Sequence, residues 1–140
     1  MACSSTQCNF VLWENPTPVV AALVQLDQHF ILARNANWPP GQFSILTGYL
    51  EKHEAPESAV LREVKEELGL DAEIKQFIGH YPFVAKNQLI IAYWVDGHGP
   101  ITLDDELAEY KRLGHEVLSR YDFGPFLLTR QIIADCGLSC

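Results

Sequence analysis

The chain has 140 residues, 48% of them hydrophobic, and carries a formal net charge of −8 at pH 7. This length suits a single domain, spanning 1–140, with a core of its own. The acidic balance disfavours a general nucleic-acid-binding surface, and no apolar run approaches the roughly 18 residues of a membrane span. The N-terminal MACSSTQCNF has neither a basic start nor a long apolar stretch, so we expect no membrane association and a cytoplasmic protein.

Three apolar, β-rich runs in the first third of the chain predict strands: Pro18–Leu26, His29–Ala33 and Phe43–Leu46. The first two flank a turn at Asp27-Gln28 and suggest a hairpin. Asn35–Gly41 contains Pro39, Pro40 and Gly41 and is typical of a loop.

A helix is predicted over Pro56–Leu68. Proline suits a first helical turn, because its missing N–H costs nothing there. The following residues are mostly good helix formers, and Gly69 is placed to end the helix in a left-handed conformation. One side of this helix, which we expect to pack against a sheet, gathers Val60, Leu61, Val64 and Leu68.

Three carboxylates stand close together on the same helix. Glu63, Glu66 and Glu67 are spaced i, i+3 and i+4, so they share a face beside Arg62. Each like-charge pair costs a few tenths of a kcal/mol, which a hard divalent cation such as Mg²⁺ would offset. The alternative is a solvated acidic helix face.

Further elements are expected downstream: strands at Ala72–Ile78 and Leu89–Val95, a loop or short helix at Asp104–Arg112, and a helix at Phe126–Ala134. Lys86-Asn87 lies near a turn between the two strands. Strands on either side of a helix, with another helix at the end, predict a layered α/β domain.

From Gly48 to Leu70 the chain reads GYLEKHEAPESAVLREVKEELGL. This stretch resembles the Nudix box, G-x5-E-x7-R-E-U-x-E-E-x-G-U with U a bulky aliphatic residue, at every position. The resemblance implies an α/β/α sandwich with a mixed β-sheet between helices. It also implies a hydrolase that cleaves a nucleoside diphosphate linked to another group X by attack of water on phosphorus.

Carried over to this sequence, the resemblance assigns roles to the box. Glu63, Glu66 and Glu67, with the backbone carbonyl of Thr47, would hold Mg²⁺ or Mn²⁺. Glu63, Glu66, Arg62 and Glu54 would form the catalytic group, in which Arg62 orients Glu63 and Glu54 braces the loop. Either Glu106 or Glu109 falls where the family often supplies another acid, and a solvated acidic run is the alternative.

The flanks resemble one branch of this family, the NADH pyrophosphatases. Trp38-Pro39-Pro40-Gly41 resembles its approach to the box, and His80-Tyr81-Pro82-Phe83 partly resembles its SQPWPFPxS motif. Four aromatic residues are therefore candidates for stacking on a base, or else for packing in the core: Trp38, Tyr49, Tyr81 and Phe83. The branch resemblance further suggests a homodimer.

The four cysteines lie near the two ends of the chain, at Cys3, Cys8, Cys136 and Cys140. Residues 1–17 resemble the place where that branch leaves a four-cysteine zinc ribbon, which makes them a candidate remnant of it. The spacings do not match the tight pairs of a tetrathiolate zinc site, so we expect free thiols.

Three functions follow as hypotheses. The first is a pyrophosphohydrolase of a dinucleotide or nucleotide sugar, such as NADH or ADP-ribose, with a small-molecule nucleotide as its partner. The second is a house-cleaning hydrolase of nucleoside triphosphates, which would yield a monophosphate and pyrophosphate instead of two monophosphates. The third is a non-catalytic Nudix module that senses a nucleotide, although no box glutamate is missing here.

Overall fold

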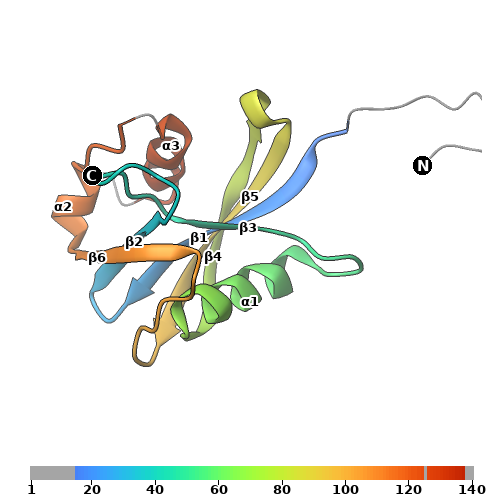
Figure 1. Ribbon diagram of the computed structural model, residues 1–140. Helices are drawn as coiled ribbons and strands as arrows, with labels where there is room; N and C mark the ends of the chain where they lie inside the picture. The colour runs from blue at the N-terminus through green and yellow to red at the C-terminus, as the bar shows by residue number, and fades with distance from the viewer. Residues whose placement is uncertain (1–14, 125, 138–140) are drawn as a thin grey trace, which may run out of the picture.

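A computed structural model describes residues 15–124 and 126–137, which fold around one mixed β-sheet (Figure 1). The strands are β1 (Thr17–Leu26), β2 (His29–Asn35), β3 (Leu46–Tyr49), β4 (Asp71–Phe83), β5 (Gln88–His98) and β6 (Leu107–Leu113). The helices are α1 (Pro56–Leu68), the short 3₁₀ turn η1 (Val84–Lys86), α2 (His115–Ser119) and α3 (Leu127–Asp135).

Strand β1 is the centre of the sheet, whose order is β4-β5-β1-β2-β6. It pairs in parallel with β5 along its whole length. On its other edge it pairs antiparallel with two strands in turn, with β3 at Val19–Ala22 and with β2 at Val24–Leu26. β1 therefore has neighbours on both edges, and β3 brings the segment that precedes α1 against its first half.

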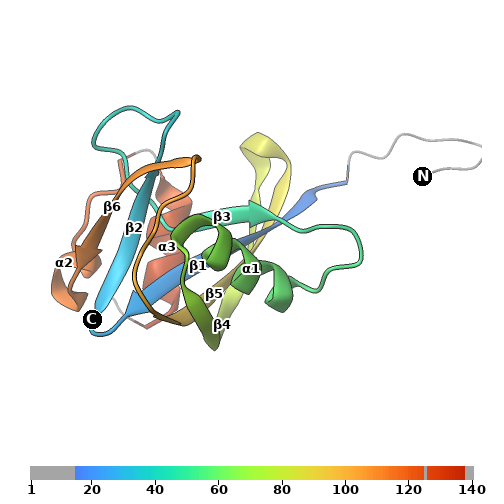
Figure 2. The same ribbon diagram turned by 60° about the horizontal axis from the view of Figure 1, so that its bottom comes forward.

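The sheet is covered on both faces, as predicted. Alternate residues of β1 point to opposite sides, so Val20 and Val24 join the cluster packed by α1, while Val19 and Leu23 join the cluster packed by α2 and α3. A strand buried on both faces needs a continuous apolar run, which explains the composition of β1. Figure 2 shows α1 and α3 on opposite sides of the sheet, which confirms the α/β/α sandwich.

The helix bounds Pro56–Leu68 agree with the prediction. Gly69 ends α1 at φ 72°, in the left-handed region that glycine adopts without a steric cost, and its N–H donates to the carbonyl of Lys65. Val60, Val64 and Leu68 are fully buried against the sheet. This burial fixes the direction of the opposite face of α1, which carries the acidic residues.

Two predicted elements were wrong. Phe43–Leu46 is not a strand: β3 begins only at Leu46, and Ser44 forms an isolated bridge with Ala33 while Phe43 packs in the core. Asp104–Arg112 was expected to be a loop or short helix, but Leu107–Leu113 is the edge strand β6, paired antiparallel with β2. The side chains of β6 are all at least partly exposed, so its hydrophobic pattern is weak and backbone pairing holds it.

The remaining strands are longer than predicted. β4 and β5 extend towards each other to the tip of a hairpin, which η1 closes. Helix α2 was not predicted, and α3 lies within one residue of the expected range.

Among the described residues, no helix has the length and apolar character to cross a membrane. Cys136 is buried, and its thiol donates to the carbonyl of Ile133. The other three cysteines, and most of the segment 1–17 that was predicted to be a ribbon remnant, lie outside the described residues.

Candidate active site

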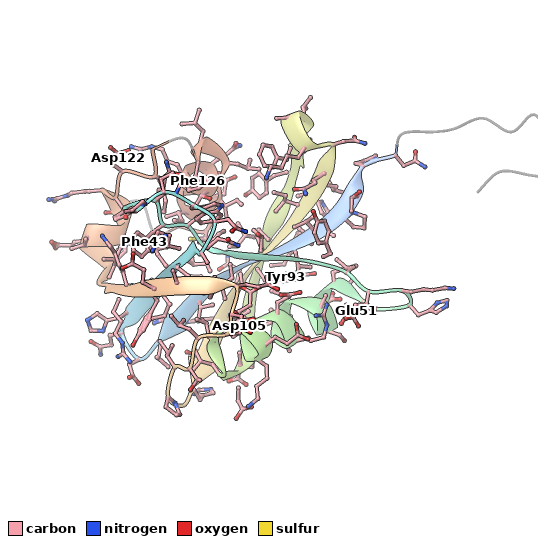
Figure 3. The ribbon with its side chains drawn as sticks, viewed as in Figure 1. Phe43, Glu51, Tyr93, Asp105, Asp122 and Phe126 are labelled. Atoms are coloured by element: carbon pink, nitrogen blue, oxygen red, sulfur yellow. The ribbon has the colours of Figure 1, made fainter. Side chains whose placement is uncertain are left out.

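A cavity of about 980 Å³ lies where α1, β3, α3 and the β4–β5 hairpin meet. Its floor is apolar and comes from β1 and β5, whereas one wall carries the acidic residues of α1. Figure 3 labels two of the lining residues, Glu51 in the loop before α1 and Phe126 at the start of α3. The volume is at the upper end of the range usual for small-molecule sites.

Arg62 organises the acidic wall. Its guanidinium binds the carboxylate of Glu54 in a bidentate manner, at 2.7 Å from Nε and 2.9 Å from Nη2. Nη1 donates to Glu63 and to Glu66, each at 3.2 Å. Nη2 also donates to the backbone carbonyl of Tyr49 at 3.1 Å, which ties the end of β3 to α1. One cation therefore fixes the orientation of three carboxylates.

Glu54 connects Arg62 to the backbone of the loop between β3 and α1. Its Oε1 accepts a hydrogen bond from the backbone N–H of Glu51 at 2.8 Å. The hydrogen bond from Arg62, with this backbone bond, lowers the pKa of Glu54 to about 2. Glu54 is consequently ionised throughout the neutral range and serves to position Arg62.

Gly48 allows Glu63 to approach the backbone of β3. A Cβ atom at position 48 would overlap the carboxyl group of Glu63. Only glycine leaves this space open, so Gly48, the first glycine of the box, is needed for Glu63 to take this position.

Glu67 is the most deeply buried of the three carboxyl groups, with 6% of its surface exposed. Burial, followed by the hydrogen bond and charge of neighbouring Glu63, raises the pKa of Glu67 to about 9. In the absence of a cation this group therefore keeps its proton at neutral pH.

The donor set fits a divalent cation. Glu63, Glu66 and Glu67 all line the cavity and offer hard carboxylate oxygens. Without a cation, the proton on Glu67 reduces the repulsion between the neighbouring carboxylates. A bound cation would offset this repulsion instead. Thr47 also lines the cavity, in β3 next to Gly48.

A second group of ligand-type side chains lies elsewhere. Glu73, Asp96 and His98 hold donor atoms within 4.8 Å of one another on β4 and β5. None of them lines the cavity. This group could accept a metal ion, but it is not placed to act on a molecule in the cavity.

The structure separates the four predicted aromatic residues. Trp38, Tyr49 and Phe83 line the cavity. Tyr81 does not: it is 5% exposed in the core, and its hydroxyl donates to Asp135 at 2.7 Å, under α3. A base has no access to its ring in this position, so the geometry does not support the predicted stacking role.

The two acids predicted outside the box, Glu106 and Glu109, have different positions in the structure. Glu106 lines the cavity, just ahead of β6. Glu109 is outside the lining and pairs with Arg34 at 2.7 Å. Glu106 is thus the one placed to join the box carboxylates.

Several lining residues were not predicted from the sequence. Lys86 and Gln88 come from the β4–β5 hairpin, and Phe126, Leu128 and Thr129 come from the start of α3. The ring of Phe126 packs against Trp38 in a tilted arrangement, with centroids 4.8 Å apart and an interplanar angle of 44°. The sequence indicated only that Lys86 lies near a turn. The residues around a turn or a terminal helix do not show which cavity that element faces in the folded protein.

Comparison with known proteins gives a consistent result. The model of the NUDIX domain family matches residues 15–131. The NAD-capped RNA hydrolase NudC of Stutzerimonas stutzeri is 31% identical over 128 residues, which are 91% of this chain and 45% of that protein. The mitochondrial NAD(P)H pyrophosphatase NUDT13 of Homo sapiens is 32% identical over 87 residues, 61% of this chain and 25% of that protein.

The crystal structure of a NUDIX hydrolase from Nitrosomonas europaea superposes with a TM-score of 0.75 at 18% identity, over 91% of this chain and 73% of that one. At this identity the match concerns the fold alone. The chain spans less than half the length of the two curated relatives.

Proposed function

The chain belongs to the Nudix family, and we propose that it is a divalent-metal-dependent pyrophosphohydrolase that cleaves a nucleoside diphosphate linked to a group X. NADH and ADP-ribose are the substrates we expect. The observation that carries this proposal is the wall of the cavity, where one helix presents Glu63, Glu66 and Glu67 and Arg62 orients the first two of them.

The protein's own groups have separate tasks in this proposal. Glu54 holds Arg62, and Arg62 holds the carboxylates of Glu63 and Glu66 towards the cavity. Gly48 leaves the space in which the carboxyl group of Glu63 lies. Such fixed positioning supplies much of the catalysis of phosphoryl transfer, since the chemistry needs little covalent participation by the protein.

Glu63, Glu66 and Glu67, with the carbonyl of Thr47, would hold Mg²⁺ or Mn²⁺. When bound, the ion neutralises charge on the phosphoryl oxygens and lowers the pKa of the attacking water. One of the box glutamates or Glu106, which lines the same cavity, would accept the proton of that water.

The aromatic residues of the cavity support a nucleotide as the substrate. Trp38 and Phe126 form a tilted aromatic pair, and Tyr49 and Phe83 also line the cavity. Stacking of a base on an aromatic ring contributes roughly 1–3 kcal/mol. Aliphatic side chains such as Val19, Ala21 and Ile90 also line the cavity, which suits the flat face of adenine or nicotinamide.

Two relatives act on substrates that contain NAD or NAD(P)H, as their names state. NAD-capped RNA contains the same diphosphate as NAD, so the acidic charge that disfavours a general nucleic-acid-binding surface does not exclude such an RNA as a substrate. The predicted cytoplasmic location and homodimer stay predictions as well.

The experiment is hydrolysis of NADH, NAD, ADP-ribose, NAD-capped RNA and the nucleoside triphosphates with Mg²⁺ or with EDTA, with products identified by mass. We expect NADH or ADP-ribose to give two monophosphates only with the metal, and Glu66→Gln to lose on the order of 100-fold or more in kcat. Cleavage of triphosphates alone would instead support the house-cleaning activity, and binding of nucleotides without turnover would support a sensing module.

A further inference from the structure

The cavity contains an imbalance of charge. Among the described residues its lining has five carboxyl groups, from Glu51, Glu63, Glu66, Glu67 and Glu106, and two basic side chains, Arg62 and Lys86. A diphosphate is itself an anion. Its binding therefore depends on every positive charge that can face it.

Arg62 is already committed to the protein. Its guanidinium donates to Glu54, Glu63 and Glu66 and to the carbonyl of Tyr49. Releasing it would remove the support of two proposed metal ligands. Arg62 is thus a positioning residue, and Lys86 is the basic side chain left to contact a ligand.

Lys86 has a different environment. It lies in η1 at the tip of the β4–β5 hairpin, exposed on the rim of the cavity. Within the described part of the chain, no carboxylate oxygen lies within the 4.0 Å that defines an ion pair with its ammonium group. Its Nζ lies over the ring of Phe83, 6.0 Å from the centroid, and Phe83 also lines the cavity.

The hairpin around Lys86 is firmly connected to the rest of the rim. Asn87 turns the chain in the left-handed region at φ 52°, and its N–H donates to the carbonyl of Val84. Gln88, the next residue, donates from Nε2 to the hydroxyl of Tyr49 at 3.3 Å, which joins β5 to the end of β3. These bonds order the backbone of the hairpin from which the Lys86 side chain extends.

Resting on the proposed function, we propose that Lys86 is a substrate-binding residue whose ammonium group binds a phosphoryl oxygen of the substrate's diphosphate. The box carboxylates act through a metal from α1, whereas Lys86 supplies a direct positive charge from the β4–β5 hairpin. Lysine is a common phosphate ligand because its ammonium group is a compact charge with three donors.

The test is the steady-state hydrolysis of ADP-ribose with Mg²⁺ by wild type, Lys86→Met, Lys86→Arg and Lys75→Met. Lys75 is the matched control, because it is also a lysine over an aromatic ring, 4.7 Å from the centroid of Trp94, but lies outside the cavity. We expect Lys86→Met to raise KM on the order of 10-fold to 100-fold with little change in kcat. Lys86→Arg should restore most of this loss, and Lys75→Met should match wild type.

Equal KM values for wild type and Lys86→Met would overturn the proposal, as would an equal loss in Lys75→Met. If neither wild type nor any variant hydrolyses ADP-ribose or NADH, the proposed function fails, and Lys86 is then decided by calorimetry of ADP-ribose binding in EDTA. A higher Kd for Lys86→Met than for wild type and Lys75→Met would support the contact. Equal Kd values for the three proteins, or no binding at all, would contradict it.

Discussion

The guanidinium of Arg62 and the carboxylate of Glu54 form two parallel hydrogen bonds, of 2.7 Å and 2.9 Å, across the loop that connects β3 to α1. This pair joins the start of the box to its helix. Bidentate arginine–carboxylate pairs fix direction as well as distance. The remaining nitrogen of Arg62 is thereby aimed at Glu63 and Glu66.

The Arg62–Glu54 pair should have a characteristic pH dependence. Arg62 lowers the pKa of Glu54 from 4.5 to about 2. A carboxyl group whose pKa is lower in the folded state stabilises the fold above its unfolded pKa, and this contribution is lost as the pH falls through the folded value. The difference in unfolding free energy between wild type and Glu54→Gln should be constant from pH 7 to about 5 and shrink towards pH 2.

Urea denaturation in EDTA across this pH range measures that difference. Glu57→Gln is the matched control, since Glu57 is an exposed glutamate in the first turn of α1. An unchanged difference between wild type and Glu54→Gln down to pH 2.5 would show that Arg62 does not hold Glu54 in solution.

Gly48→Ala should damage the site more than the fold. The added methyl group would occupy the position of the Glu63 carboxyl group and displace it. A misplacement of about 1 Å near the reacting atoms lowers kcat on the order of 100-fold. Gly114→Ala is the control, because a Cβ there meets nothing within 4 Å. Equal kcat values for the two variants would mean that Glu63 does not depend on this space.

Glu67→Gln should stabilise the metal-free protein. The folded state holds an extra proton on Glu67, whose pKa is raised from 4.5 to about 9, so stability falls as the pH rises between these values. The amide removes this slope, and at pH 8 we expect a gain of roughly 1–3 kcal/mol in the free energy of unfolding.

The same variant should lose the stabilisation that Mg²⁺ gives to wild type, because a metal ligand is gone. Thermal unfolding with EDTA and with excess Mg²⁺ measures both the stability of the metal-free protein and the stabilisation by Mg²⁺. Glu66→Gln, at a more exposed carboxylate of the same face, should lose the Mg²⁺ effect without the gain in EDTA. A destabilised Glu67→Gln protein in EDTA would contradict the account of this buried group.

Trp38→Leu should weaken nucleotide binding. Trp38 lines the cavity and packs against Phe126, so its loss should raise KM for NADH or ADP-ribose about 10-fold. Tyr81→Leu is the matched variant at the other aromatic residue, because it removes the ring that packs in the core and the hydroxyl that donates to Asp135 of α3. If Tyr81→Leu raises KM as much as Trp38→Leu in a protein that remains folded, the assignment of the two rings to cavity and core is wrong.

The sequence predicted the acidic wall because all its parts are local. Pro56 and Gly69 bound the helix, and the spacing of Glu63, Glu66 and Glu67 follows from the helical period. It did not predict β6, because an exposed edge strand needs no hydrophobic alternation and takes its pairing from β2.

The rest of the cavity depends on tertiary structure. The bulges in β4 shift the pairing between Ile74 and Gln76 and between Phe77 and Gly79, so position along this strand does not show where Tyr81 will lie. Phe126 reaches the cavity only because α3 packs across the sheet. Such tertiary contacts cannot be predicted from the spacing of neighbouring residues in the sequence.

The most direct measurement is the hydrolysis of NADH in H₂¹⁸O with Mg²⁺, followed by mass analysis of both products. The account predicts two monophosphates, one of which carries a single ¹⁸O, and no reaction in EDTA or with Glu66→Gln. Cleavage that persists in EDTA and in the variant would contradict the assignment of the box carboxylates as the catalytic centre, and intact NADH under all conditions would contradict the proposed cleavage of NADH.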